Sequence, residues 1–115
     1  MVVTRVVFEH VAQHRRLYRA LIGSRGGGVM LRQAQRDLSD VFREHLEQAV
    51  AQHRVAPAVP VEIVVQFMVG SLLTLLTWWL DNDLPYSPDE MSDAFQRLSH
   101  DGLANTLIAG HADSP

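Results

Sequence analysis

The chain has 115 residues, 47% hydrophobic and 20% charged, which is the composition of one soluble globular domain with a core of its own. It has no cysteine, which excludes disulfides, thiolate metal sites and a cysteine nucleophile. Its formal net charge of −3 argues against this chain gripping a nucleic-acid backbone by itself.

The first predicted element is a helix over residues 3–22, where apolar residues such as Val7, Leu17 and Leu21 recur at spacings of three and four. The run "GSRGGG" ends it, because successive glycines lose too much backbone entropy to continue a helix. The chain enters this helix without the basic start, apolar stretch and cleavage site of a signal peptide. We therefore expect a cytoplasmic protein.

A second helix is predicted over residues 29–54, with Leu31, Leu38 and Leu46 on its apolar stripe. The run "VAPAVP" breaks it, because each proline restricts its predecessor to an extended conformation. A third, strongly apolar helix follows over residues 61–80.

The fourth helix begins at "SPDEM", where Ser87 is the predicted N-cap and Glu90 completes an S-x-x-E capping box. The pattern is lost after Leu103, so residues 104–115 are expected to fray. The predicted fold is all-α: an antiparallel bundle of about four helices.

The apolar third helix is long enough to cross a bilayer. Glu62 and Gln66 in its first turns, the lack of a flanking basic cluster and the three amphipathic helices around it argue against a membrane span. A helix that is apolar nearly all round must be covered nearly all round, and a domain this small has too few helices to do so. A second copy in a two-fold dimer is the simplest cover. A monomer core helix with no partner remains the alternative.

The predicted dimer seam uses the small residues of the third helix, one tryptophan and the apolar stripe of the fourth helix. Trp78 and Trp79 point in different directions, so one can fill the core while the other faces a partner or a cavity. The seam residues are Gly70, Ser71, Thr74, Thr77, Trp78, Met91 and Phe95.

The segments "HRRLYRAL", "WWL" and "YSPDEM" give the chain a resemblance to the C-terminal regulatory domain of TetR-type transcriptional regulators. Over residues 5–103 it most resembles the dihydroxyacetone-kinase-regulator type of C-terminal domain. The resemblance implies that the last two helices form an intersubunit four-helix bundle and that each subunit holds an effector site. It also implies a helix-turn-helix DNA-binding domain ahead of this region, which residues 1–115 do not supply, so we expect a fragment or a descendant without its DNA-reading domain.

Histidines on or beside apolar stripes are the sharpest chemical feature. His10 and His14 have the i, i+4 spacing of a shared metal site, but no carboxylate joins their stripe and no HExxH motif is present. No metal or cofactor is therefore expected. Histidines bonded to backbone carbonyls in the core or at its rim are the plainer interpretation. If an effector pocket exists, its predicted lining combines aromatic, flexible apolar and hydrogen-bonding groups, namely His14, Tyr18, Phe42, His45, Phe67 and Met68.

Two further features have plain interpretations. Arg15, Arg16 and Arg19 form a basic face that is expected to be solvated, the alternative being contact with the absent domain or an acidic partner. The run "DNDLPY" is expected to form the turn that ends the third helix.

These features favour a ligand-sensing, dimerising domain of a bacterial transcriptional regulator, which reaches DNA only through an absent domain. The alternatives are a helical interaction module without an effector and a small histidine-based or metal-dependent enzyme. No Ser–His–Asp arrangement is legible, so no enzymatic activity is expected.

Overall fold

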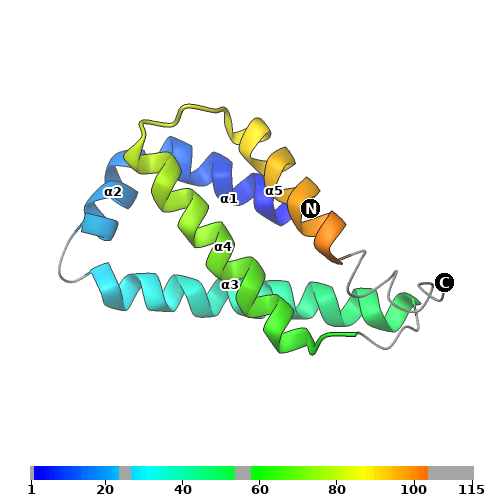
Figure 1. Ribbon diagram of the computed structural model, residues 1–115. Coiled ribbons are helices and arrows are strands. Elements are labelled where there is room, and N and C mark those ends of the chain that lie inside the picture. The colour runs from blue at the N-terminus through cyan, green and yellow to red at the C-terminus, as the bar shows by residue number, and fades with distance from the viewer. Residues whose placement is uncertain (1, 24–26, 54–57, 104–115) are drawn as a thin grey trace.

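The computed structural model describes residues 2–23, 27–53 and 58–103, which form five helices and no strand (Figure 1). The helices are α1 (Val2–Gln13), α2 (Arg15–Gly23), α3 (Gly27–His53), α4 (Val61–Asp81) and α5 (Pro88–Leu103). The all-helical prediction is confirmed for this part of the chain. The expected tail at 104–115 lies outside the described residues.

The helix expected over residues 3–22 is divided in two, which corrects the prediction of four helices. α1 and α2 meet at His14, and α2 turns away from the line of α1 (Figure 1). The His14 N–H donates to the His10 carbonyl oxygen at 3.1 Å, and the Tyr18 N–H donates to the His14 carbonyl oxygen at 3.1 Å. The helical hydrogen bonds therefore continue through a bend, and the periodic pattern gives no sign of it.

The start of α5 is built as its sequence predicts. The Ser87 N–H donates to Glu90 Oε1 at 3.0 Å, and the Glu90 N–H donates to Ser87 Oγ at 3.1 Å. These two bonds satisfy free N–H groups at the helix terminus and confirm the capping box. They also lower the pKa of the Glu90 carboxyl.

The turn between α4 and α5 is confirmed as well. Asp83 and Leu84 adopt φ angles of 62° and 52°, and the Leu84 N–H donates to the Trp79 carbonyl oxygen at 2.9 Å. This backbone bond ends α4 and turns the chain back toward α5. Leu84 packs against the core, which offsets the strain of its left-handed backbone conformation.

The core is organised around α4, which crosses α3, while α5 lies against α1 (Figure 1). The inner side of α4 is buried against apolar residues from α1, α3 and α5, among them Phe8, Phe42 and Phe95. The buried residues of α4 are Val64, Val65, Met68, Val69, Leu72, Leu76, Trp79 and Leu80. By length and composition alone α4 could cross a membrane, but these residues make it the core helix of the fold.

The helices spread more widely than those of a compact domain. The radius of gyration is 15.5 Å, whereas a compact chain of this length has about 13 Å. The extents are 49 × 27 × 20 Å. An elongated arrangement of helices leaves parts of their faces without cover from their own chain.

Candidate functional site

The two tryptophans at the end of α4 occupy opposite environments. The Trp79 side chain is fully buried, with its ring edge-on to Phe8 at 5.4 Å between centroids, and its Nε1–H donates to the Tyr86 carbonyl oxygen at 2.8 Å. Trp78 is 44% exposed and stacks on the Tyr86 ring, with 6.4 Å between centroids. Trp79 therefore holds the core together, and Trp78 belongs to the surface.

The outer face of α4 carries an apolar stripe. Ile63, Phe67 and Trp78 are 58%, 71% and 44% exposed, and small residues at 70, 71 and 74 continue the helical spacing between them. A Cβ built on Gly70 meets nothing within 4 Å. We call this stripe (Ile63, Phe67, Gly70, Thr74 and Trp78) the α4 outer face. Its middle, at Gly70, is open to close approach by another helix.

The predicted seam residues divide between this surface and the interior. Trp78 and Thr74 are exposed, and Gly70, Ser71 and Thr77 are half-buried. Met91 and Phe95, by contrast, are buried in the core of their own chain.

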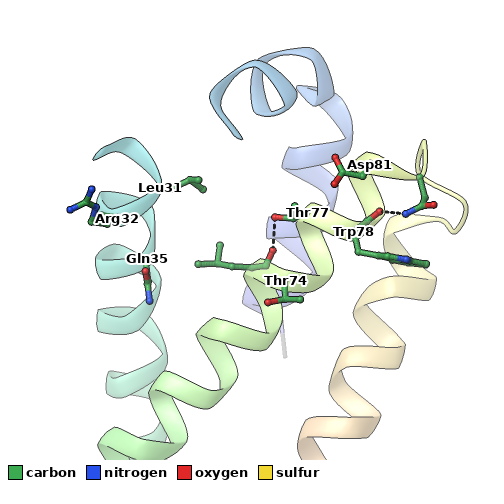
Figure 2. A pocket seen from close by; sticks show the side chains of 9 residues that line it. Leu31, Arg32, Gln35, Thr74, Thr77, Trp78 and Asp81 are labelled. Carbon is green, nitrogen blue, oxygen red and sulfur yellow. Dashed lines mark hydrogen bonds between the residues drawn. The ribbon is translucent and has the colours of Figure 1, made fainter. Parts of the chain in front are cut away.

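A groove of about 550 Å³ runs between the first half of α3 and the end of α4. In Figure 2, Leu31 points from α3 toward α4 while Arg32 points away, and Thr74 and Thr77 lie on the α4 side. Trp78 lies at its edge, on the side toward α5. Three of the predicted seam residues therefore line one hollow.

A second cavity, of about 260 Å³, lies between α1, α2, α3 and α4. Its floor is apolar and includes the buried Val11, Leu76 and Leu80. His10 and Tyr18 line it from either side of the bend at His14, and the Tyr18 hydroxyl bonds to His10 Nδ1 at 2.8 Å. We call this space the bend cavity.

The bend cavity and the groove share part of their lining. Leu31, Leu73 and Thr77 line both. The Thr77 hydroxyl donates to the Leu73 carbonyl oxygen at 3.0 Å, which fixes its side chain between the two spaces. A molecule in one space therefore touches side chains that border the other.

Arg19 is exposed, as expected for a solvated face, but it also connects α2 to the end of α4. Its Nη2 donates to the Leu80 carbonyl oxygen at 2.9 Å and to Asp83 Oδ1 at 3.0 Å. A cation at the C-terminal end of a helix complements the helix dipole and satisfies a free carbonyl. The bonds attach α2 to α4. Arg15 and Arg16 are exposed as expected.

With the fold and these surfaces in place, comparison with known families is decisive. A family model of the TetR type, described as "Transcriptional regulator C-terminal region", matches residues 3–101. The chain belongs to this family. No curated protein and no solved structure matches the chain. The match covers all five helices of this TetR-type domain, including the α4 outer face and the bend cavity.

The residues predicted to line an effector pocket are not gathered in one place. Tyr18 lines the bend cavity. Phe42 and Met68 are buried in the core. His14 and His45 are exposed, and Phe67 lies on the α4 outer face.

Sequence reasoning missed Asp37, Leu76 and Leu80, which line the bend cavity. A buried core residue and a cavity residue share the same apolar stripe, so periodicity does not separate them. Asp37 offered the one usable signal, because it follows Ala34 by three residues and therefore lies beside the apolar stripe of α3.

The histidine pair lies at the bend. The rings of His10 and His14 are 4.6 Å apart between centroids. Within the described residues, no group of three or more histidine or carboxylate side chains is placed to hold a metal ion. His10 instead pairs with Tyr18 through the hydrogen bond described above.

Proposed function

We propose that this chain is the ligand-sensing and homodimerisation domain of a bacterial, cytoplasmic TetR-type regulator, acting on DNA through a separate helix-turn-helix domain and having no catalytic role. Family membership supports the regulatory assignment. The two remaining parts, dimerisation and effector binding, each correspond to a surface of this chain: the α4 outer face and the bend cavity.

The observation that carries the proposal is the α4 outer face. It places Phe67 and Trp78 in solvent on the helix that forms the centre of the core. Large exposed apolar side chains in one stripe mark an interaction surface. A two-fold axis at this stripe brings the same residues of two copies together, and Gly70 lets the helices approach closely.

In this dimer α5 contributes through its outer side. Met91 and Phe95 support the interface from within, because they pack in the core beneath it. Leu98, which is exposed on α5, supplies an outward apolar contact. The four-helix bundle between subunits is thereby built from the exposed sides of α4 and α5.

The bend offers a route from effector to DNA. Tyr18 and Ile22 of α2 line the bend cavity, and Arg19 between them is bonded to the end of α4. A ligand that prefers one arrangement of α1 and α2 shifts the population toward it. In a dimer, that shift changes the separation of the two DNA-reading domains, which must match the spacing of half-sites.

Sedimentation equilibrium tests the dimer, with substitutions chosen for their different effects on the monomer. Trp78→Glu and Thr74→Arg place charge on the α4 outer face and are expected to give monomers. Gly70→Leu adds a side chain where the chain's own atoms leave open space. If this variant no longer dimerises, the cause is a clash with the partner subunit and not a clash within its own chain. Leu17→Glu, an exposed apolar position on α2, is the control and is expected to remain dimeric.

A wild-type chain that sediments as a monomer would contradict the dimer. Seam variants that all stay dimeric would place the interface elsewhere. Circular dichroism of each variant shows whether the helices are retained.

Two finer points belong to the same proposal. The dihydroxyacetone-kinase-regulator type remains the nearest group that we infer, on the segments "HRRLYRAL" and "YSPDEM". The alternative of an interaction module without an effector predicts the same dimer but an unoccupied bend cavity, so ligand binding separates the two.

A further inference from the structure

The bend cavity has an unusual charge for an effector site. Asp37 is the one residue with a formal charge at neutral pH among those that line it, when His10 is counted as neutral. Among the residues that the structure describes, no arginine lines the cavity. An anionic ligand in this space would therefore lie near the Asp37 carboxylate, while the neighbouring Arg19 guanidinium is already bonded to the Leu80 carbonyl oxygen and to Asp83.

The hydrogen-bonding groups of the cavity are mainly acceptors. One carboxylate oxygen of Asp37 accepts from Gln33 Nε2 at 3.0 Å, and a carboxylate can accept several further hydrogen bonds. The Thr77 hydroxyl proton is committed to the Leu73 carbonyl oxygen, which leaves its oxygen as an acceptor. The Tyr18 hydroxyl and His10 Nδ1 bond to each other at 2.8 Å, which uses one of the two protons that this pair can donate. A ligand that donates hydrogen bonds suits this lining better than one that accepts them.

The rest of the cavity favours a short hydrocarbon. The floor is formed by the buried Val11, Leu76 and Leu80, while Asp37 is exposed at the rim. A volume of about 260 Å³ is below the roughly 300–1,000 Å³ of sites for drug-sized ligands. The geometry thus separates an apolar end, inside, from an anionic end at the rim.

We propose that the bend cavity binds a small lipophilic amine in its protonated form, with the hydrocarbon on the floor and the ammonium group at Asp37. This inference rests on the effector-binding role proposed above and names the chemistry of that effector. Apolar burial supplies the affinity, and the ammonium–carboxylate pair supplies the selection.

Three six-carbon probes that differ only in the head group test this inference: hexylamine, 1-hexanol and hexanoate. Their binding to the full chain is measured by isothermal titration calorimetry at low and high salt. Hexylamine is expected to bind tightest and hexanoate weakest. The hexylamine affinity is expected to fall with salt, since the ion pair at the rim is solvent-accessible.

Substitutions locate the binding. Asp37→Asn is expected to weaken hexylamine about fivefold, the upper range for a solvent-accessible ion pair, and to leave 1-hexanol unchanged. Glu47→Gln removes an exposed carboxylate from the same helix away from the cavity and is expected to change nothing. Ala34→Trp fills the rim from an exposed position, so the fold is retained, and it is expected to block all three probes.

The outcomes distinguish this inference from the function on which it rests. Equal or tighter binding of 1-hexanol or hexanoate, blocked by Ala34→Trp, would overturn the amine and leave an effector site of other chemistry. Unchanged hexylamine binding in Asp37→Asn would also overturn it. If none of the probes binds, the amine inference fails, while sedimentation of the same sample still decides the dimer.

Discussion

Both sides of α4 carry large apolar side chains, but the surroundings of the two sides are very different. On the inner side, Trp79 is enclosed by its own chain, with its ring against Phe8 and its N–H bonded to Tyr86. On the outer side, Trp78 and Phe67 meet solvent. The contrast shows that only one side of this apolar helix is covered by its own chain, and the proposed dimer uses the other side.

The same contrast explains why α4 resembles a membrane span in composition. A helix with one covered side has polar residues on the other, as α3 does. On α4, apolar residues extend beyond the covered side to the exposed Ile63, Phe67 and Trp78. α4 therefore satisfies a length and composition test for membrane spans through its place in the fold.

Truncating the two tryptophans gives the largest expected difference between the sides. Trp79→Ala leaves a large cavity in the core and is expected to cost about 3–5 kcal/mol of unfolding free energy. Trp78→Ala is expected to cost less than about 1 kcal/mol in the monomer, because it removes a partly exposed side chain. Urea unfolding followed by circular dichroism at several protein concentrations measures both.

The concentration series sharpens this result. Unfolding of a dimer depends on protein concentration, and Trp78→Ala is expected to reduce that dependence. Similar losses for the two variants at every concentration would contradict the assignment of separate roles. Trp79→Phe keeps a ring in the core and serves as the milder variant if Trp79→Ala does not fold.

Removing the N-cap of α5 is expected to lower the free energy of unfolding by less than removing Trp79 from the inner side of α4. Ser87 follows directly after Tyr86, whose carbonyl oxygen accepts the Trp79 N–H, so the cap helps to fix the segment over the core. Ser87→Ala is expected to cost about 1 kcal/mol of unfolding free energy. Ser99→Ala, near the other end of α5, is the control and is expected to cost less in the same urea titration.

The smallest effect is expected at the exposed start of α4. Arg43 donates from Nε to Glu62 Oε2 at 2.8 Å and from Nη2 to Oε1 at 2.9 Å. These bonds, together with one from Gln66, lower the pKa of Glu62 from 4.5 to about 2. Because the folded-state pKa is lowered, the stabilisation is complete above pH 4.5 and is lost as the pH falls toward 2.

Thermal unfolding across that pH range checks the sign. The unfolding temperature of Glu62→Gln is expected to be slightly lower than that of the wild type at neutral pH. This difference in unfolding temperature is expected to disappear between pH 4.5 and 2. Glu47→Gln, which removes an exposed carboxylate from α3, controls for the change in net charge. A gap that widens on acidification would contradict the assigned bonds.

Much of the fold could be predicted from the sequence because its signals are local. Prolines and glycines separate the helices, and Ser87 with Glu90 specifies the start of α5. The bend at His14 could not be predicted, because the helical hydrogen bonds continue through it and no proline or glycine is present there. A contact distant in sequence, from Arg19 to the Leu80 carbonyl oxygen, accompanies the bend.

The candidate site was harder to predict for a related reason. Helical periodicity assigns a residue to a face, but a face can point into the core or into a cavity. Phe42 and Met68 are completely or almost completely enclosed, whereas Tyr18 lines the bend cavity, and all three were chosen on the same criterion. Only the packing between helices, which places Leu80 and Asp37 around one space, distinguishes these cases.

The wall formed by Leu31, Leu73 and Thr77 has a thermodynamic consequence. It borders both hollows, so in the proposed dimer a ligand in the bend cavity and a second subunit that covers the groove would act on the same three side chains. Coupling of this kind is reciprocal. If ligand binding raises the dimerisation constant by some factor, dimerisation raises the affinity for the ligand by the same factor. Diluting the protein should then alter how tightly it holds its ligand, without any change in the cavity's own chemistry.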